Sequence, residues 1–198
     1  MKTRKDAWAL VTEFTASPNL INHMLAVEAA MRAYAQHFGE DEALWGIVGL
    51  LHDFDYERYP DLTVEGHPVV GSKILRERGW SEEIIRAVLS HADYTGVTRE
   101  TRMEKTLAAV DDLTGFVTAV ALVRPSKSIH DVKVKSIRKK WKSKALLRPS
   151  TARRLRRRLR IWASSCGPTW HLCYRRCKAS PMSWACKVSL FEPCLGKG

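Results

Sequence analysis

The first 148 residues of this 198-residue chain contain no cysteine, and no part of the chain has an apolar run long enough to cross a membrane. Residues 1–6 are polar, and no apolar stretch of the signal-peptide type follows them. A segment of about 150 residues can bury a substantial core without disulfides. These absences argue against membrane insertion and secretion, and we expect a cytoplasmic protein.

Acidic residues are almost missing from the last quarter of the chain. Residues 149–198 have 11 Lys and Arg against the single acid Glu192, whereas residues 1–148 have 22 Lys and Arg against 20 Asp and Glu. The formal net charge of +12 is therefore mostly a property of the end of the chain. We accordingly expect one domain, residues 1–148, followed by a basic tail, residues 149–198.

The tail is rich in Arg, Trp and Cys, and it holds all five cysteines without any C-x-x-C pair, so we expect no zinc site there. The change of composition has three interpretations: a nucleic-acid-binding arm, a disordered basic tail, or the product of a shifted reading frame. Back-translation from Ala145 with free wobble bases can give, one frame over, an acid-balanced amphipathic peptide. We favour the frameshift, and predict an irregular, poorly ordered tail with no specific nucleic-acid partner.

Apolar residues in the first segment recur every three or four positions, which predicts an all-α fold. One helix is marked at both ends, because Ser17-Pro18 is typical of a helix start and Gly39 of a helix end. Thr101 and Glu104 have the spacing of a capping box at another start. The expected helices cover residues 7–14, 18–38, 41–51, 69–78, 82–89, 101–123 and 133–144.

Several polar residues occupy apolar faces of these helices, namely His23, His52-Asp53, His91 and Asp111. Burying such groups without a partner is costly. A single buried histidine is usually a core residue bonded to a backbone carbonyl. Four separate elements that each direct an imidazole or carboxylate inward are better explained by a shared metal centre, which compensates all of them together.

The order His23, His52-Asp53, Asp111 on a helical scaffold resembles the HD-domain superfamily of metal-dependent phosphohydrolases. The steps Gly66-His67-Pro68 and Ser90-His91-Ala92-Asp93 resemble its two-metal subgroup, which has two additional histidines and includes bacterial diadenosine tetraphosphate hydrolases. The resemblance covers residues 5–145 or so. It implies an HD-domain helical bundle followed by the irregular basic tail.

The resemblance also implies a ligand set. His23, His52, Asp53 and Asp111 would hold one divalent metal, and Asp53 would bridge to a second metal held by His67 and His91. Imidazole and carboxylate ligands suit iron, manganese, cobalt or zinc. A hydroxide shared by the two metals would attack the phosphorus of a small phosphorylated or nucleotide substrate, with His52 and Asp53 as the catalytic residues.

Other polar residues are candidates for substrate contacts. Arg124 and Lys127 directly follow the helix that carries Asp111 and are candidate phosphate binders, although a solvated loop explains them equally well. Residues 56–59 fall where the family has a mobile loop over the site. Asp112 and Asp93 either accept hydrogen bonds from the metal-binding residues or are surface acids, and we favour the surface interpretation for both.

Two functions of other classes fit the same sequence. Some relatives on this scaffold use a di-iron pair to activate oxygen, and iron dependence with oxygen consumption would favour that chemistry. A non-enzymatic protein with a structural metal, or with a nucleic-acid-binding tail, is the other alternative. Six candidate ligands, rather than the four of a closed structural site, speak against it.

Overall fold

The computed structural model describes residues 2–127, 132–141, 143 and 149–166. In this part of the chain all regular elements are helices, which confirms the all-α prediction. None of the described helices is both long and apolar enough to cross a membrane. Two compact units are present, residues 1–110 and 111–198, and their boundary falls inside one helix. The predicted domain limit at residue 148 is a different division and stays a prediction.

Each predicted helix has a counterpart in the structure. The elements are α1 (Arg4–Phe14), α2 (Pro18–Phe38), α3 (Glu42–Leu51), α4 (Val69–Glu77), α5 (Glu82–His91), the 3-10 helix η1 (Asp93–Thr95), α6 (Arg102–Leu122), α7 (Val134–Trp141) and α8 (Pro149–Cys166).

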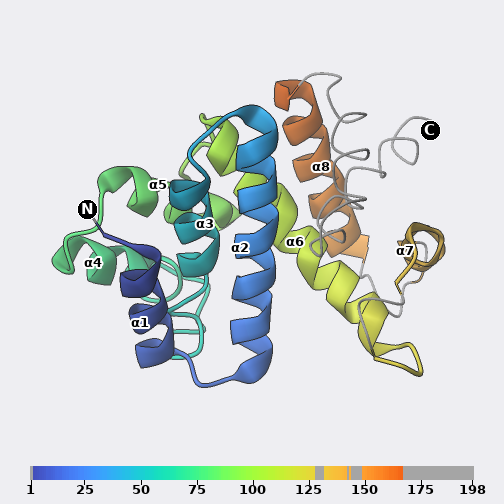
Figure 1. The fold of residues 1–198 in the computed structure, drawn as a ribbon, viewed down its shortest axis with the longest axis horizontal. Helices are drawn as coiled ribbons and strands as arrows, with labels where there is room; N and C mark the ends of the chain where they lie inside the picture. The colour runs from blue at the N-terminus through green and yellow to red at the C-terminus, as the bar shows by residue number, and fades with distance from the viewer. Residues whose placement is uncertain (1, 128–131, 142, 144–148, 167–198) are drawn as a thin grey trace. The chain divides into compact units, whose positions relative to one another are not determined.

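Helix α3 is the central element of the first unit. It lies between α1 and α2 (Figure 1) and also packs against α5, and all its residues from Trp45 to Leu51 are buried. At Gly49 an added Cβ would come within 2.9 Å of the Cα of Glu28 on α2. Only glycine therefore allows these two backbones to lie so close, and this contact sets the spacing between the residues that α2 and α3 contribute to the site.

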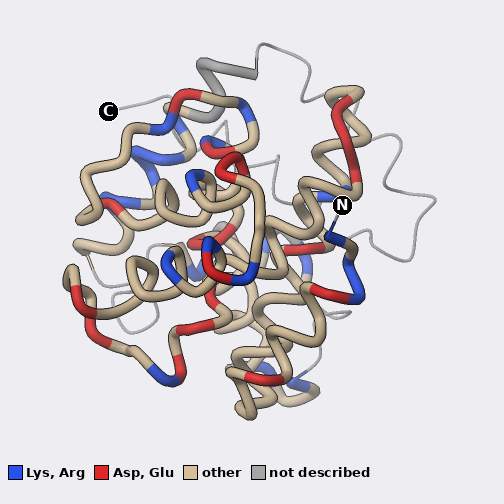
Figure 2. Tube along the Cα trace, turned by 90° about the vertical axis from the view of Figure 1, so that its left-hand side faces the viewer, with Lys and Arg blue, Asp and Glu red and all other residues tan. Residues whose placement is uncertain are grey.

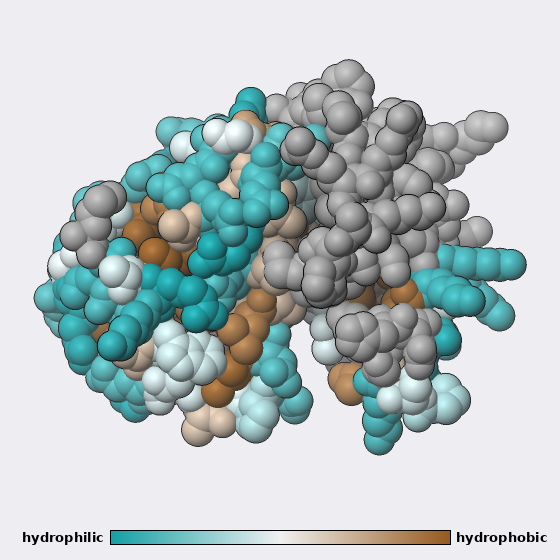
Figure 3. Space-filling view, viewed as in Figure 1, coloured by the Kyte–Doolittle hydropathy of each residue, from teal (hydrophilic) through white to brown (hydrophobic). Residues whose placement is uncertain are grey.

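The surface carries charges of both signs. Figure 2 shows acidic and basic residues interspersed along the described chain, in keeping with the nearly balanced counts for residues 1–148. The described surface that faces the viewer in Figure 3 is mostly hydrophilic, with smaller hydrophobic patches. A surface of this kind needs no structural explanation of its own.

The helix ends confirm several predicted caps. Gly39 ends α2 with a φ of 70°, the left-handed conformation that favours glycine. Thr101 and Glu104 form the capping box at the start of α6, with bonds of 3.2 and 2.9 Å between each side chain and the other residue's backbone N–H. Ser17 and Ser81 occupy the predicted cap positions of α2 and α5, but neither side chain makes a capping hydrogen bond.

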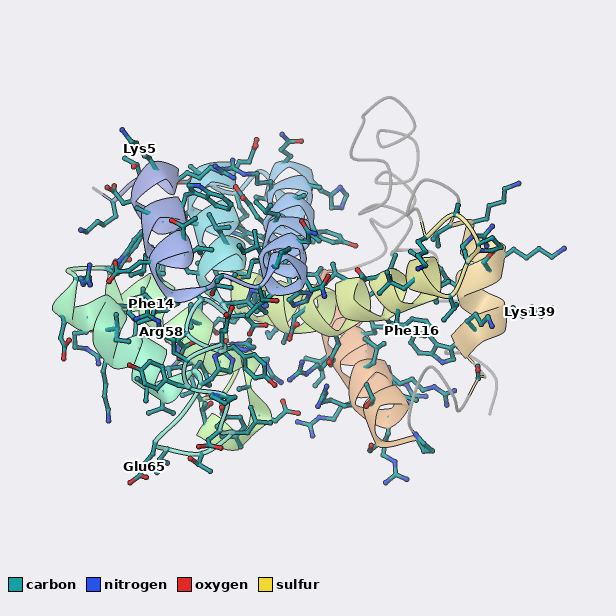
Figure 4. All side chains as sticks on the ribbon, turned by 90° about the horizontal axis from the view of Figure 1, so that it is seen from below. Lys5, Phe14, Arg58, Glu65, Phe116 and Lys139 are labelled. Carbon is teal, nitrogen blue, oxygen red and sulfur yellow. The ribbon has the colours of Figure 1, made fainter. Side chains whose placement is uncertain are left out.

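The segment after α3 holds the residues just before α2 in place. The Glu57 carboxylate accepts hydrogen bonds from the backbone N–H groups of Ala16 (3.0 Å) and Ser17 (2.9 Å). The Arg58 guanidinium lies 4.3 Å from the centre of the Phe14 ring, and both side chains are labelled in Figure 4. Glu57 and Arg58, considered above as possible substrate contacts, thus hold this segment to the connection between α1 and α2.

In the second unit, α7 and α8 both contribute to a small core. Ile137 and Trp141 of α7 are buried, and the Trp141 ring meets that of Phe116 edge to face at 5.4 Å between centroids. Leu155 and Leu159 of α8 are buried as well. Phe116 is labelled in Figure 4 on the α6 ribbon.

Helix α8 corrects part of the prediction for the tail. Residues 149–166 are helical rather than irregular, because Pro149 suits the first helical position and Leu155 and Leu159 are spaced to share one face. Arg154 and Arg158 add ion pairs of 2.7 and 2.9 Å to Asp112. Residues 167–198, the rest of the predicted irregular tail, lie outside the described residues.

Candidate metal centre

Four elements of the first unit deliver the predicted histidines and Asp53 to one place. His23 lies in the second turn of α2, His52 caps the end of α3, His67 lies two residues before α4 with a cis bond to Pro68, and His91 is the last residue of α5. The rings of His52, His67 and His91 are buried, whereas His23 and Asp53 are partly exposed. The cluster is therefore mostly buried in the core, and only its His23 and Asp53 side chains are partly exposed to solvent.

Asp53 is the centre of this cluster. Its Oδ2 lies 3.3 Å from His52 Nε2 and 3.6 Å from His23 Nε2. Its Oδ1 lies 3.2 Å from His67 Nε2 and 3.5 Å from His91 Nε2. Each carboxylate oxygen thus faces its own pair of imidazoles, and the ligand atoms of each group lie within 4.8 Å of one another.

Hydrogen bonds on the outer sides of the rings fix how three of the histidines are protonated. The Nδ1–H of His52 donates to the Gly49 carbonyl at 2.8 Å, that of His91 to the Val88 carbonyl, and that of His67 to the Asp55 carboxylate at 2.7 Å. In a neutral ring the Nε2 atom then carries a lone pair. All three lone pairs are directed into the cluster.

The facing nitrogens are close enough to share a proton or a metal ion. His67 Nε2 and His91 Nε2 are 3.2 Å apart, as are His52 Nε2 and His23 Nε2. Two lone pairs at this distance repel each other, so each pair of nitrogens needs either a proton or a metal ion between them. Imidazole nitrogens and a carboxylate are also the donors that divalent transition metals prefer, so the residues present fit metal ions at both pairs.

The electrostatics of the cluster favour an ionised Asp53. Burial raises the pKa of the Asp53 carboxyl, but the charge of His52 and hydrogen bonds with His52, His67 and His91 outweigh burial and hold that pKa well below its ordinary value. For His67, burial lowers the pKa, whereas hydrogen bonds with Asp53 and Asp55 raise it, to about 9. Asp53 therefore supplies negative charge at the centre of the cluster.

Asp55 is a buried residue of the site that the sequence analysis missed. Its Oδ1 accepts the hydrogen bond from His67 Nδ1, and its Oδ2 accepts one from the backbone N–H of Gly71 at 2.8 Å. The side chain is completely buried. The available signal was an acid two residues after Asp53, with the apolar Phe54 between them.

Two tyrosines lie near the His67 end of the cluster. The Tyr56 ring meets the His67 ring edge to face at 5.3 Å between centroids and is 39% exposed. Burial and the negative charges of Asp55 and Asp53, with Tyr56, raise the pKa of Tyr94 to about 12. Tyr56 thus remains available to a substrate, unlike Glu57 and Arg58.

Asp111 and the predicted phosphate binders belong to the second unit. Asp111 follows Val110 on the uninterrupted helix α6, one turn after the fully buried Leu107. Arg124 donates from Nη1 to the Ser136 hydroxyl at 3.1 Å, and Lys127 has a φ of 48°. Their roles as metal ligand and as phosphate contacts stay predictions.

The two acids that we favoured as surface residues differ. The Asp93 side chain is 37% exposed and pairs with Arg99 at 2.5 Å, as a surface acid can. The prediction for Asp112 was wrong, because its side chain is only 6% exposed and accepts from Arg154 and Arg158. Asp112 is thus an ion-pair partner of α8.

A family model described as the HD domain matches residues 20–114. All six predicted metal ligands fall within this stretch, including His23 near its start and Asp111 near its end. Residues 20–114 are thus similar to the HD domain, which confirms the resemblance to this superfamily, and the cluster around Asp53 lies within the matched stretch.

Two curated relatives of this HD domain are similar over about half of the chain. One, ribonuclease Y of Oleidesulfovibrio alaskensis, is 31% identical over 100 residues, which are 50% of this chain and 18% of the relative. The other, an uncharacterized protein of Methanocaldococcus jannaschii, is 33% identical over 102 residues, which are 49% of this chain and 58% of the relative. The chain thus spans less than two thirds of either relative. No solved structure matches it significantly.

Proposed function

We propose that this protein is a metal-dependent phosphohydrolase that holds two divalent cations around Asp53. The observation that carries the proposal is that the two oxygens of the Asp53 carboxylate face different histidines. Oδ2 faces His23 and His52, and Oδ1 faces His67 and His91. A single carboxylate between two sets of imidazoles is suited to bridge two ions. A closed structural site would need only one set of four ligands.

The first cation would be held by His23, His52 and Asp53, with Asp111 as the fourth ligand. Asp111 is assigned from helical spacing, since it lies four residues after buried Leu107 on α6. The second cation would be held by Asp53, His67 and His91. Iron, manganese, cobalt and zinc all suit this combination of ligands.

When bound, such a cation pair supplies Lewis acidity, which lowers the pKa of water and neutralises charge on a phosphate group. The chain's own residues prepare the site for it. Backbone carbonyls hold the rings of His52 and His91 with their Nε2 atoms inward, and Asp53 stays ionised between them. His23 and Asp53 are the partly exposed members of the cluster, so a phosphate group would approach from their side.

We propose a small phosphorylated or nucleotide compound as the substrate. The exposed Tyr56 ring beside His67 could stack on a nucleobase, and Arg124 and Lys127 could bind phosphate oxygens. One relative is named as a ribonuclease, so short RNA belongs in the substrate panel as well.

The test is phosphate release by protein loaded with manganese, cobalt or ferrous iron. The panel comprises nucleotides, dinucleoside polyphosphates, phosphomonoesters and short RNA, with chain cleavage as the readout for RNA. The Asp53→Asn variant should lose turnover, whereas Glu77→Gln, which removes an exposed carboxylate from α4, should retain it. If folded protein with two bound metals releases no phosphate and cleaves no RNA from any compound in the panel, the proposal is overturned. Oxygen consumption by the iron-loaded protein would instead support di-iron oxygenase chemistry.

A further inference from the structure

We propose that Asp55 is the positioning residue of the second cation site, where it fixes the tautomer and orientation of His67. The inference rests on the proposed two-metal function, and it assigns a role to a residue that belongs to neither set of ligands. The three buried histidines differ in what holds their outer nitrogen. His52 and His91 use backbone carbonyls, whereas His67 uses the Asp55 carboxylate.

The first step of the argument is the hydrogen bond itself. Asp55 Oδ1 lies 2.7 Å from His67 Nδ1, a short distance typical of a bond to a charged acceptor. A carboxylate can only accept, so the proton must sit on Nδ1 of His67. The Nε2 atom then faces Asp53 Oδ1 and His91 Nε2, each at 3.2 Å.

The second step is that Asp55 is itself held in place. Its other oxygen accepts from the backbone N–H of Gly71 in the first turn of α4, where such donors lack partners within the helix. An added Cβ at Gly71 would lie 2.6 Å from both Cγ and Oδ2 of Asp55. The absence of a side chain at Gly71 therefore creates the space that the Asp55 carboxylate fills.

The third step is that α4 and the second ligand form one unit. His67 lies two residues before α4, and its backbone N–H donates to the Tyr59 carbonyl at 2.8 Å. Asp55 thus joins the start of α4 to the segment that follows Asp53. A carboxylate behind a metal-binding imidazole also makes that imidazole a stronger donor, and loss of such a partner typically costs about 10–100-fold in metal affinity.

The experiment compares Asp55→Asn with wild type and with Glu83→Gln, which removes an exposed carboxylate from α5. The asparagine keeps the size of the side chain and an oxygen that can accept from Gly71, but it removes the charge. Titration with manganese or cobalt should show two sites in wild type and in Glu83→Gln. In Asp55→Asn the affinity of one site should fall about 10–100-fold while the other is retained.

A second readout needs no metal. Recorded above pH 9, where the His67 ring is neutral, long-range nitrogen–proton NMR spectra of the histidine rings should show His67 with its proton on Nδ1 in the wild type, and a mixture of tautomers in Asp55→Asn. Gly71→Ala provides an independent variant, since it displaces the carboxylate without removing its charge. Gly71→Ala should reproduce the selective loss of one metal site. This variant also keeps the test possible if Asp55→Asn does not fold.

Outcomes of the two proposals are distinguishable. Wild-type affinity for both cations and an unchanged His67 tautomer in folded Asp55→Asn would overturn the role of Asp55. Equal weakening of both sites would also overturn it, because that result indicates a general structural effect. Wild-type protein that binds two cations but cleaves no phosphate ester would instead contradict the proposed function and leave the role of Asp55 intact.

Discussion

At the scale of residues, the chemistry depends on which nitrogen of each histidine points inward. Gly49, Val88 and Asp55 each accept a hydrogen bond from an Nδ1–H group, and the Nε2 atoms meet around Asp53. Two of these acceptors lie three residues before their histidine on the same helix, so ordinary helical geometry presents the ligand. The third acceptor, Asp55, comes from another segment.

Removal of one histidine should remove one cation. His23→Ala should weaken only the site on the Oδ2 side of Asp53, and His67→Ala only the site on the Oδ1 side, because each ring faces a single oxygen. Calorimetric titration with manganese would count the remaining sites. Loss of both sites in His67→Ala, with the fold intact, would mean that the two groups of ligands form one centre.

The sequence predicted the side chains that cluster around Asp53 better than the residues that hold them in place. His23, His52, Asp53 and His91 could be found because polar groups on apolar helix faces need a shared partner. Asp55 could not be found in that way, because it lies in irregular turns where no periodicity applies. The predicted surface exposure of Asp112 was wrong, because its partners Arg154 and Arg158 belong to a stretch for which we predicted no regular structure.

At the scale of elements, the contact of α2 with α3 brings the first ligands together. Gly49→Ala places a methyl group 2.9 Å from the Glu28 Cα, so the helices must separate. We expect a loss of about 1–3 kcal/mol in the free energy of unfolding, as for other overpacked core positions. Urea denaturation measures this loss.

Gly115→Ala is the matched control for this prediction. Gly115 also lies inside a helix, but in the described structure no atom would come within 4 Å of its added Cβ. That variant should be neutral or more stable by up to about 1 kcal/mol, because alanine favours the helix. Equal destabilisation by both substitutions would contradict the account of close packing.

A distant segment anchors the residues just before α2, and the loss of this anchor should be measurable. Glu57→Ala deletes the acceptor of the backbone N–H groups of Ala16 and Ser17, so we expect a loss of about 1 kcal/mol, typical of a lost hydrogen-bond acceptor. The same denaturation experiment applies, with Glu77→Ala as the control. An unchanged midpoint for Glu57→Ala would show that water replaces the carboxylate at no cost.

Local signals predicted the helices well where caps and apolar periodicity agree. Pro18, Gly39, Thr101 and Glu104 lie at the helix ends that they predicted. Ser17 shows the limit of this reasoning, because it occupies the N-cap position but its side chain makes no capping bond, and its backbone N–H is bound by Glu57, 40 residues away. Helix α8 was missed because its leucines were outweighed by a run of arginines.

At the scale of the whole molecule, charge is distributed unevenly along the chain. The exposed face of α8 presents arginines at helical spacing along an open groove of about 610 Å³. The residues that line this groove are Pro149, Ala152, Arg153, Arg156, Arg157, Arg160 and Ile161. Such a face attracts polyanions through charge rather than through sequence recognition.

We therefore expect the protein to bind heparin or single-stranded RNA weakly and with strong salt dependence. Replacement of the four groove arginines by glutamine should lower the salt concentration at which the protein elutes from heparin and should leave metal binding unchanged. Elution of the variant at the wild-type salt concentration would show that other basic residues carry the interaction. Sequencing of the DNA around codons 144–150 tests the proposed frameshift separately.

The central claim is that Asp53 bridges two cations, and metal content tests it most directly. Wild-type and Asp53→Asn proteins, each loaded with manganese and freed of excess by gel filtration, should be compared by elemental analysis and circular dichroism. The account predicts two ions per wild-type chain and loss of both in a folded Asp53→Asn variant, because one carboxylate serves both sites. Two tightly bound ions in Asp53→Asn would contradict it.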